Sequence, residues 1–182
     1  MIKVPDYAGT CTCNFDTPLG SLVAIAENNA LTGLRFSAQK HNLAKKDNRI
    51  CDPDYPVFKK LRDWLGDYFS GTDRPHNLQL APRGTVFQEA VWNILLKIPF
   101  GQVSTYGDVA RGMAAACGLP SMSAQAVGGA IGRNPITILI PCHRVVGADR
   151  RLVGYAGGLD KKEALLQVEH INLARVKLYQ LD

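Results

Sequence analysis

The sequence has no long apolar run. Residues 1–6 lack the hydrophobic centre of a secretory signal peptide. No later run approaches the roughly 20 apolar residues that a membrane-spanning helix needs. Low-complexity segments are missing too, and a 182-residue chain with 46% hydrophobic residues can build one large core or two small ones. We therefore expect a folded, intracellular protein, in the cytoplasm or in the nucleoid or nucleus, with no membrane partner.

The sequence also has no complete metal-binding or phosphate-binding motif. Cys11 and Cys13 form a C-x-C pair, but no second pair or His-x-His motif completes a zinc site. Five cysteines, an odd number, in an intracellular chain predict thiols that are mostly reduced. The glycine-rich residues 154–158 can offer backbone N–H groups to a ligand, but they lack the Lys-Thr of a phosphate loop. The sequence thus predicts no cofactor and no metal.

The first part of the chain has the pattern of a small α+β unit. Alternating apolar and polar positions over residues 20–36, interrupted by Asn28-Asn29, predict a β-hairpin or the start of a meander. Pro56 begins a helix that Gly71 ends. We expect a loop or irregular helix over residues 40–54 and an edge strand leading into a linker over residues 71–84. The predicted domains are an N-terminal α+β domain, residues 1–83, and a C-terminal domain, residues 84–182.

The second part of the chain is mainly helical. Thr85 with Gln88, and Thr105 with Asp108, have the spacing of capping boxes that begin two helices. A third helix is expected over residues 124–131, after a break at Gly118-Leu119-Pro120. Two helices around a glycine-containing turn are typical of a helix-turn-helix, although an ordinary helical hairpin has the same pattern.

Two further features of the C-terminal part are the glycines of the third predicted helix and a last helix. Gly128 and Gly129 cost on the order of 1 kcal/mol each relative to alanine inside a helix. Such a cost is tolerated where the helix backbone must pack closely, either against the Pro141-Cys142 turn or inside a narrow DNA groove. A last helix is expected over about residues 160–169. The predicted class is α/β, with a helix-turn-helix and a short strand or turn that carries a cysteine in the C-terminal domain.

That cysteine is Cys142. A β-branched run over residues 136–140 predicts a short buried strand that must turn at Pro141. Cys142, His143 and the later Glu169 supply a nucleophile, a base and an acid that orients the base. Because adjacent residues of an extended chain point to opposite faces, His143 can reach the sulfur only through a turn or a water. A buried structural cysteine is the alternative interpretation.

With these residues gathered, the sequence resembles the O6-alkylguanine-DNA alkyltransferases, also called methylated-DNA–protein-cysteine methyltransferases. The motifs that carry the resemblance in the C-terminal part are Asn134-Pro135, Pro141-Cys142-His143-Arg144-Val145, Gly154-Tyr155-Ala156-Gly157-Gly158, Lys162 with Leu165-Leu166 and Glu169, Gly84-Thr85-Val86-Phe87-Gln88, Val91-Trp92 and Ile98-Pro99-Phe100-Gly101. Thr17-Pro18-Leu19-Gly20 and Tyr68-Phe69-Ser70-Gly71 match more loosely.

The resemblance implies direct-reversal DNA repair by a methylated-DNA–protein-cysteine S-methyltransferase. Such a protein flips O6-alkylguanine, and O4-alkylthymine as well, out of double-stranded DNA. It then transfers the alkyl group irreversibly to its cysteine in a single turnover. The resemblance also implies a monomer whose third helix enters the minor groove. A net charge of +5 is compatible with a polyanionic partner.

The resemblance further assigns roles to residues of this chain. Cys142 would accept the alkyl group, His143 would take its proton through a water, and Glu169 would orient the imidazole. Asn134 would hold the cysteine turn, and Tyr106 would donate a proton to the leaving guanine and crowd the target phosphate. Contacts to the base or the DNA are implied for Gln125, Ile131, Arg144, Val145, Tyr155, Ala156 and Thr105.

The chain departs from the family pattern at several positions. Gln125 stands where the family usually has an arginine that fills the gap left by the flipped base, and Ala156 replaces a hydroxyl residue of some members. The interval from Tyr106 to Gly118 is longer than usual, and Arg111 within it can compensate for the missing arginine. We expect weaker DNA binding or slower repair than in an arginine-bearing relative.

Two other functions fit the same residues. A recognition protein of this architecture would bind alkylated bases without reacting, although such proteins replace the nucleophile, typically with tryptophan. A Cys-His-Glu hydrolase acting on a small acyl substrate would need an oxyanion hole and would turn over. Incubation with alkylated oligonucleotide separates these functions from alkyl transfer.

Overall fold

The computed structural model describes residues 9–38 and 55–181. The N-terminal region is an antiparallel three-stranded sheet in chain order, formed by β1 (Thr10–Phe15), β2 (Leu22–Glu27) and β3 (Ala30–Phe36). Asn28 and Asn29 join β2 to β3 with φ of 48° and 62°. A tight hairpin turn requires such left-handed residues, and asparagine tolerates them. The predicted hairpin is confirmed, and β1 extends it to a meander.

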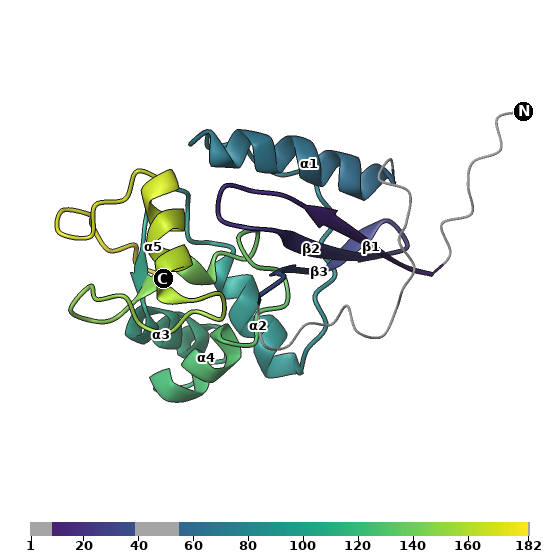
Figure 1. The fold of residues 1–182 in the computed structure, drawn as a ribbon. Helices are drawn as coiled ribbons and strands as arrows, with labels where there is room; N and C mark the ends of the chain where they lie inside the picture. The colour runs from purple at the N-terminus through teal and green to yellow at the C-terminus, as the bar shows by residue number, and fades with distance from the viewer. Residues whose placement is uncertain (1–8, 39–54, 182) are drawn as a thin grey trace, which may run out of the picture.

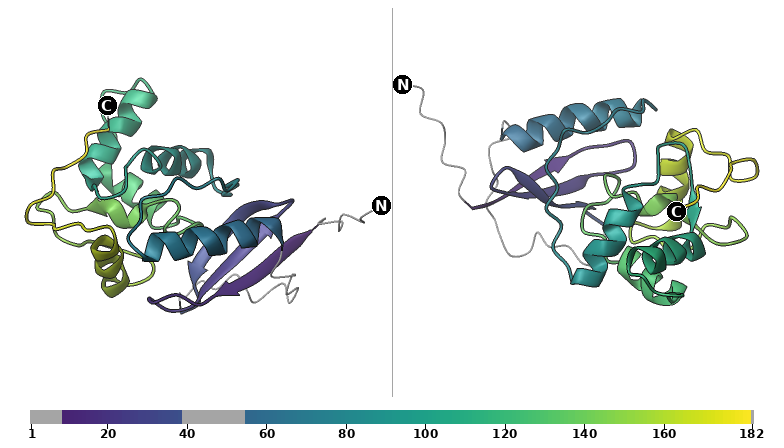
Figure 2. Two further views of the ribbon diagram at one scale, coloured as in Figure 1. Left: turned by 90° about the horizontal axis from the view of Figure 1, so that it is seen from above. Right: turned by 180° about the vertical axis from the view of Figure 1, so that it is seen from behind.

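Helix α1 (Pro56–Phe69) covers one face of this sheet (Figures 1 and 2). It buries Val57, Leu61, Leu65 and Tyr68, which recur at helical spacing. Gly71 follows the helix with φ of 80°, a conformation that glycine adopts without strain. The helix that the sequence predicts is therefore confirmed. The expected loop over residues 40–54 lies outside the described residues.

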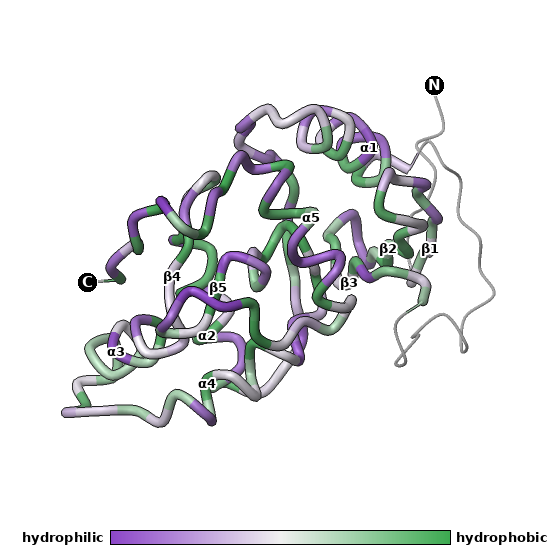
Figure 3. The backbone as a smooth tube through the Cα atoms, turned by 60° about the vertical axis from the view of Figure 1, so that its left-hand side comes forward, coloured by the Kyte–Doolittle hydropathy of each residue, from purple (hydrophilic) through white to green (hydrophobic). Residues whose placement is uncertain are grey.

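The C-terminal region contains the four other α-helices of the described chain, α2 (Val86–Leu95), α3 (Tyr106–Ala116), α4 (Ala124–Ile131) and α5 (Leu159–Val168). Both predicted capping boxes are present, at Thr85 and at Thr105, and the Ser123 hydroxyl caps α4. Helices α2, α3 and α4 pack against one another at one end of the molecule (Figure 3). The fold class is as predicted, with a small sheet region followed by a mainly helical one.

Two predicted strands are not formed. Residues 71–84 contain one bridge, between Leu80 and Leu31, in place of an edge strand. In residues 136–140, Ile136 makes a single bridge to Leu34 and the chain then turns. Ile138 has φ of 70°, a rare conformation for a β-branched residue, which breaks the extended chain.

The two regions share one hydrophobic core. Buried residues from the sheet, α1 and the C-terminal helices belong to one cluster. The backbone joins the regions as well, because Leu34 N donates to Pro135 O (2.9 Å) and Thr137 N donates to Leu34 O (2.8 Å). The segment before Cys142 is thus anchored to β3. In the described part of the chain, no helix is long and apolar enough to cross a membrane.

The glycines of α4 are not required by packing against the cysteine turn. A Cβ on Gly128 would meet only the Tyr106 ring, at 3.5 Å, and one on Gly129 would meet only the Arg133 side chain, at 3.5 Å. The interpretation that these glycines let α4 approach Pro141-Cys142 is therefore wrong. The other interpretation, the close approach of a narrow DNA groove, is compatible with these contacts.

Candidate active site

The Asn134 side chain shapes the turn that carries Cys142. Its amide nitrogen donates to Ile140 O (2.8 Å) and to Cys142 Sγ (3.1 Å), and its oxygen accepts from Ile136 N (3.0 Å). These bonds use backbone groups that a strand would pair with its neighbour, which explains why no strand forms. Cys142 then begins the short 3₁₀ helix η2 (Cys142–Arg144), so the turn expected at Pro141 is present.

Cys142 lines a cavity of about 240 Å³. Its side chain is only 7% exposed, so the sulfur is approached through this cavity. The walls come from the N-terminus of α3, the C-terminal end of α4, the cysteine turn and the glycine-rich loop. The lining residues are Tyr106, Gly128, Ile131, Gly132, Asn134, Thr137, Cys142, Gly154, Tyr155 and Ala156. The cavity brings together Cys142, Asn134, Tyr106, Ile131, Tyr155 and Ala156 of the predicted site.

Behind Cys142 lies a buried histidine–carboxylate pair. His143 Nε2 and Glu169 Oε1 are 2.6 Å apart, and both side chains are fully buried. An ionised carboxylate only accepts hydrogen bonds, so Nε2 carries the proton. The other ring nitrogen, Nδ1, is buried and makes no hydrogen bond with a described residue. The pair thus leaves Nδ1 as the basic nitrogen.

The charges around this pair favour an ionised acid and a neutral base. Burial alone would raise the pKa of Glu169, but His143 and Arg144 lower it to about 2 through charge and hydrogen bonds. Burial lowers the pKa of His143, and this outweighs the opposing effect of Glu169. His143 is therefore unprotonated at neutral pH and can accept a proton.

The Cys142 thiol is protonated in the resting state. Burial raises its pKa, and the hydrogen bond from Asn134 and the charge of Lys162 lower it in part. A protonated thiol needs a base before it can attack. The neutral His143, the adjacent residue, is the base that the site offers.

Lys162 holds the wall of the cavity in place. Its ammonium group donates to Val145 O (2.6 Å), Val153 O (2.6 Å) and Gly154 O (3.3 Å), and the side chain is fully buried. Burial lowers its pKa to about 8. Because one ammonium group bonds all three carbonyls, Lys162 joins the residue that follows η2 to the glycine-rich loop.

Two tyrosines contribute hydroxyls to the cavity. Tyr106 Oη donates to Val153 O (3.0 Å), and burial, with the charge of Cys142 next, raises its pKa. The phenol therefore keeps its proton at neutral pH. Tyr155 Oη lies 2.6 Å from Thr137 Oγ1, close to the floor formed by the cysteine turn.

Other predicted site residues lie outside the cavity. The Gln125 side chain is exposed in the first turn of α4. Thr105 is buried, and its hydroxyl donates to Asp108. Arg144 turns away from the cavity, donating to Glu169 (2.8 Å) and to Ile98 O (2.7 Å). Val145 is buried and offers only its backbone, whose carbonyl already accepts from Lys162.

Three functional contacts were missed from the sequence. Tyr68, Lys162 and Thr137 belong to quoted motifs or predicted elements, but no pattern assigned them a partner. A lysine inside an apolar helix face was the one available signal, because a buried lysine needs buried acceptors.

Arg111 forms an ion pair with Asp108 of its own helix, so its guanidinium is engaged within α3.

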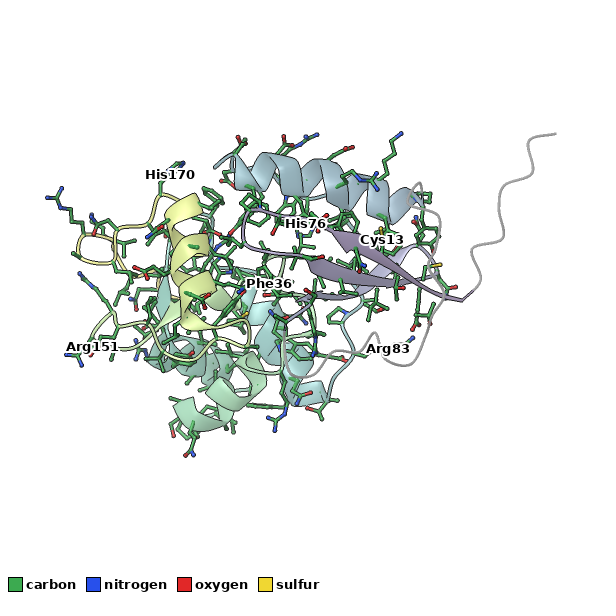
Figure 4. All side chains as sticks on the ribbon, viewed as in Figure 1. Cys13, Phe36, His76, Arg83, Arg151 and His170 are labelled. Carbon is green, nitrogen blue, oxygen red and sulfur yellow. The ribbon has the colours of Figure 1, made fainter. Side chains whose placement is uncertain are left out.

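The other cysteines that the structure describes lie outside the cavity. Cys13 and Cys117 are free, whereas Cys11 is disulfide-bonded, which differs from the expected reduced state. Cys13 lies on the sheet, far from the helical end (Figure 4). Within residues 9–38 and 55–181, no group of three or more His, Cys, Asp or Glu side chains could hold a metal ion.

A cavity that Cys142 lines, with a neutral histidine as the next residue, defines a protein that uses cysteine as a nucleophile. Comparison with known proteins specifies the class. Two family models match the chain, the DNA-binding domain of 6-O-methylguanine DNA methyltransferase over residues 86–171 and the ribonuclease-like domain of the same protein over residues 12–82.

Individual relatives agree with these models. The methylated-DNA–protein-cysteine methyltransferase of Methanosarcina acetivorans is 39% identical over 155 residues, which cover 85% of this chain and 95% of that protein. The protein of the same name from Mycobacterium tuberculosis is 40% identical over 154 residues, covering 85% and 88%. A crystal structure of Mycobacterium tuberculosis OGT in complex with DNA matches with a TM-score of 0.75 and 38% identity, covering 92% of this chain and 94% of that one.

The chain therefore belongs to the 6-O-methylguanine DNA methyltransferase family and is a DNA alkyltransferase. The family resemblance expected from its motifs is confirmed.

Proposed function

We propose that this chain repairs alkylated double-stranded DNA by flipping O6-alkylguanine, and O4-alkylthymine, into the Cys142 cavity and taking the alkyl group in a single turnover. The observation that carries the proposal is the position of Cys142. Its sulfur lines a small cavity and has a neutral, Glu169-bound histidine beside it in the chain. A base inside the duplex cannot present its O6 substituent to a recessed sulfur, so extrusion is required.

The chemistry balances with the groups of the site and water. The Cys142 proton passes to His143 Nδ1 through a water, and the sulfur attacks the alkyl carbon. The S–C bond forms as the O6–C bond breaks, and the electron pair goes to the guanine oxygen. Tyr106, which keeps its proton at neutral pH, donates it to the leaving guanine, and the proton taken by His143 then returns to the Tyr106 oxygen through water. The thioether has no hydrolytic route back to a thiol, so each molecule reacts once.

The features around the cavity support DNA as the partner. An adjoining cavity of about 980 Å³ is lined by Arg35, Arg83 and Arg133, and it shares Tyr155 and Ala156 with the Cys142 cavity. Arginines bind phosphate well, and a strand that delivers a base to Cys142 would carry its phosphates past them. Arg83 is largely exposed (Figure 4) and forms an ion pair with Glu27, so a phosphate would compete with that carboxylate for its guanidinium.

We assign DNA entry to α4 and the minor groove. Ala124, Gln125, Ala126 and Gly129 are exposed on this helix. Small side chains let a helix backbone enter a narrow groove, and packing does not require the glycine at position 129, where a Cβ would meet only the Arg133 side chain. We further propose that one molecule acts alone, because the residues of the proposed reaction come from one chain. The division into domains at residues 83 and 84 remains our proposal.

The test counts methyl groups. Protein is incubated with excess duplex oligonucleotide that carries O6-[³H]methylguanine, and protein-bound label is measured against time. We expect a plateau at one methyl group per molecule, with unmodified guanine in the product DNA. Binding without label would indicate a recognition protein, and release of many product molecules per protein would indicate a hydrolase. Either result would reject the proposal.

Gln125→Arg is expected to tighten binding to alkylated duplex about 2- to 5-fold, because one added charge near phosphate contributes about 1 kcal/mol or less at an exposed position. The change is measured as Kd at two salt concentrations. Gln167→Arg, an exposed position on α5, adds the same charge away from α4 and should change Kd less. Weaker binding or slower repair by Gln125→Arg would contradict the assignment of α4.

A further inference from the structure

Helix α1 belongs to the N-terminal sheet region, yet its last turn reaches the histidine–carboxylate pair. Tyr68 Oη lies 2.8 Å from Glu169 Oε1 and 3.4 Å from His143 Nε2. The tyrosine side chain is 2% exposed. Its hydroxyl is therefore part of the buried hydrogen-bond network behind Cys142, although it comes from the other region of the fold.

The direction of each hydrogen bond follows from the chemistry of the groups. The Glu169 carboxylate only accepts, so the Tyr68 hydroxyl donates its single proton to Oε1. The same oxygen accepts from His143 Nε2 (2.6 Å) and from Arg144 Nη2 (3.0 Å). The second oxygen, Oε2, accepts from Arg144 Nε (2.8 Å) and from Gly101 N (3.3 Å). Three donors thus converge on the oxygen that holds the imidazole.

We propose that Tyr68 is a positioning residue for the alkyl transfer, and that its hydroxyl, by donating to Glu169 Oε1, fixes the carboxylate that orients His143. The N-terminal region then completes the active site and does more than pack against it. This inference rests on the proposed function for its kinetic consequence. Its effect on the imidazole is independent of that function.

The hydroxyl also sets the basicity of His143. Four charged or titratable side chains surround the His143 imidazole: Glu169, Lys162, Arg144 and Tyr68. Among the charged ones, Glu169 alone raises the pKa of His143. A donor on Oε1 withdraws negative charge from that oxygen and so weakens its pull on an imidazolium. Removal of the hydroxyl should therefore raise the pKa of His143.

The aromatic ring of Tyr68 is packed independently of its hydroxyl. It stacks on Trp64 with the ring centroids 5.2 Å apart and 24° between the planes, and it meets Phe69 and Phe100 edge-on. Phenylalanine can keep these ring contacts. The Tyr68→Phe variant therefore removes the hydrogen bond with little change of shape.

Tyr55 provides a matched control. It lies next to α1, is fully buried, and its hydroxyl accepts a hydrogen bond from Asn29 N (2.7 Å), in the sheet region. Tyr55→Phe thus removes a buried hydroxyl of the same region that does not touch the histidine–carboxylate pair. Denaturant unfolding of both variants shows how much stability each loses.

The experiment measures two quantities for the parent chain and both variants. One is the single-turnover rate of methyl transfer as a function of pH. The other is the titration of His143, followed by NMR of the labelled imidazole ring and assigned among the four histidines with His143→Gln. For Tyr68→Phe we expect the rate at pH 7 to fall about 3- to 10-fold, and the His143 titration and the acid limb of the rate profile to move up by about 0.5–1 pH unit. Tyr55→Phe should move neither.

The possible failures are distinguishable. If Tyr68→Phe is slower but its His143 titration and acid limb match those of the parent, the tyrosine is merely structural and the inference is wrong. An unchanged rate and profile would also overturn it. If the parent chain itself transfers no methyl group, the proposed function fails, and the NMR titration still decides whether Tyr68 controls His143.

Discussion

Replacement of Cys142 by serine is expected to lower the single-turnover rate of alkyl transfer by about 10⁴-fold or more, which in practice abolishes repair. A serine hydroxyl hardly ionises at neutral pH, and His143 is a weak base beside it. Sulfur is also far more nucleophilic toward carbon than a neutral hydroxyl. The rate is measured with excess protein over methylated duplex, so that binding does not limit it.

Cys117→Ser is the matched control for this variant. Cys117 is free and exposed, after the end of α3, and its loss should leave the rate unchanged. Cys142→Ser should still bind the duplex, because residue 142 is buried and contributes little to the protein surface that DNA would contact. Lesion clearance by Cys142→Ser at the parent rate would show that another group accepts the alkyl.

Glu169→Gln is expected to slow transfer by about 10²- to 10⁴-fold. The neutral amide can present its NH₂ to Nε2, and the imidazole then adopts the tautomer with its proton on Nδ1, where the base must be free. The rate is measured under the single-turnover conditions used for Cys142. Glu163→Gln, an exposed position on α5, should have no effect.

The same variant should also lose about 3–5 kcal/mol of unfolding free energy, since the Arg144 guanidinium stays largely buried without its carboxylate.

The stability of the parent chain should also depend on pH through Glu169. The folded-state pKa of Glu169, about 2, lies below the ordinary value of 4.5. A depressed carboxyl pKa stabilises the fold above the unfolded-state pKa, and this stabilisation is lost as the pH falls from about 4.5 toward 2. The parent should therefore lose more stability than Glu169→Gln over that range in denaturant unfolding. Parallel curves for the two proteins would contradict the ionised Glu169.

Locally encoded elements could be predicted from the sequence. Both capping boxes, the Asn28-Asn29 turn and the start of α1 at Pro56 depend on residues a few positions apart, and all are present. Hydrogen bonds within one turn of chain decide such features. Cys142, with Asn134 before it and His143 and Glu169 behind it, could be gathered from a motif because these residues keep fixed spacings.

The residues 136–140 illustrate what could not be predicted. Their β-branched side chains favour a strand, but the Asn134 amide takes the backbone groups at Ile136 and Ile140. Among the described residues, these five pair with a neighbouring segment in a single bridge, between Ile136 and Leu34, about 100 positions earlier. A propensity states what a segment prefers in isolation, and a single side chain within the turn overrides it here.

Arg144 and Tyr68 show the same limit for the site. Arg144 was expected at the DNA or the base, but Glu169 lies within its reach from the C-terminal end of α5, and a buried carboxylate attracts a guanidinium. Tyr68 had the periodicity of a core residue, which it satisfies. Its contact with Glu169 joins positions 101 residues apart, and no spacing along the chain encodes such a pair.

The central claim is that the sulfur of Cys142 keeps the alkyl group that the DNA loses. Peptide mass spectrometry of the protein after reaction with an O6-methylguanine duplex tests it most directly. We expect one methyl group on the peptide that contains Cys142, on the sulfur, in amounts equal to the guanine restored. Restored guanine without methylation of Cys142, or with the methyl group on Cys13 or Cys117, would contradict the account.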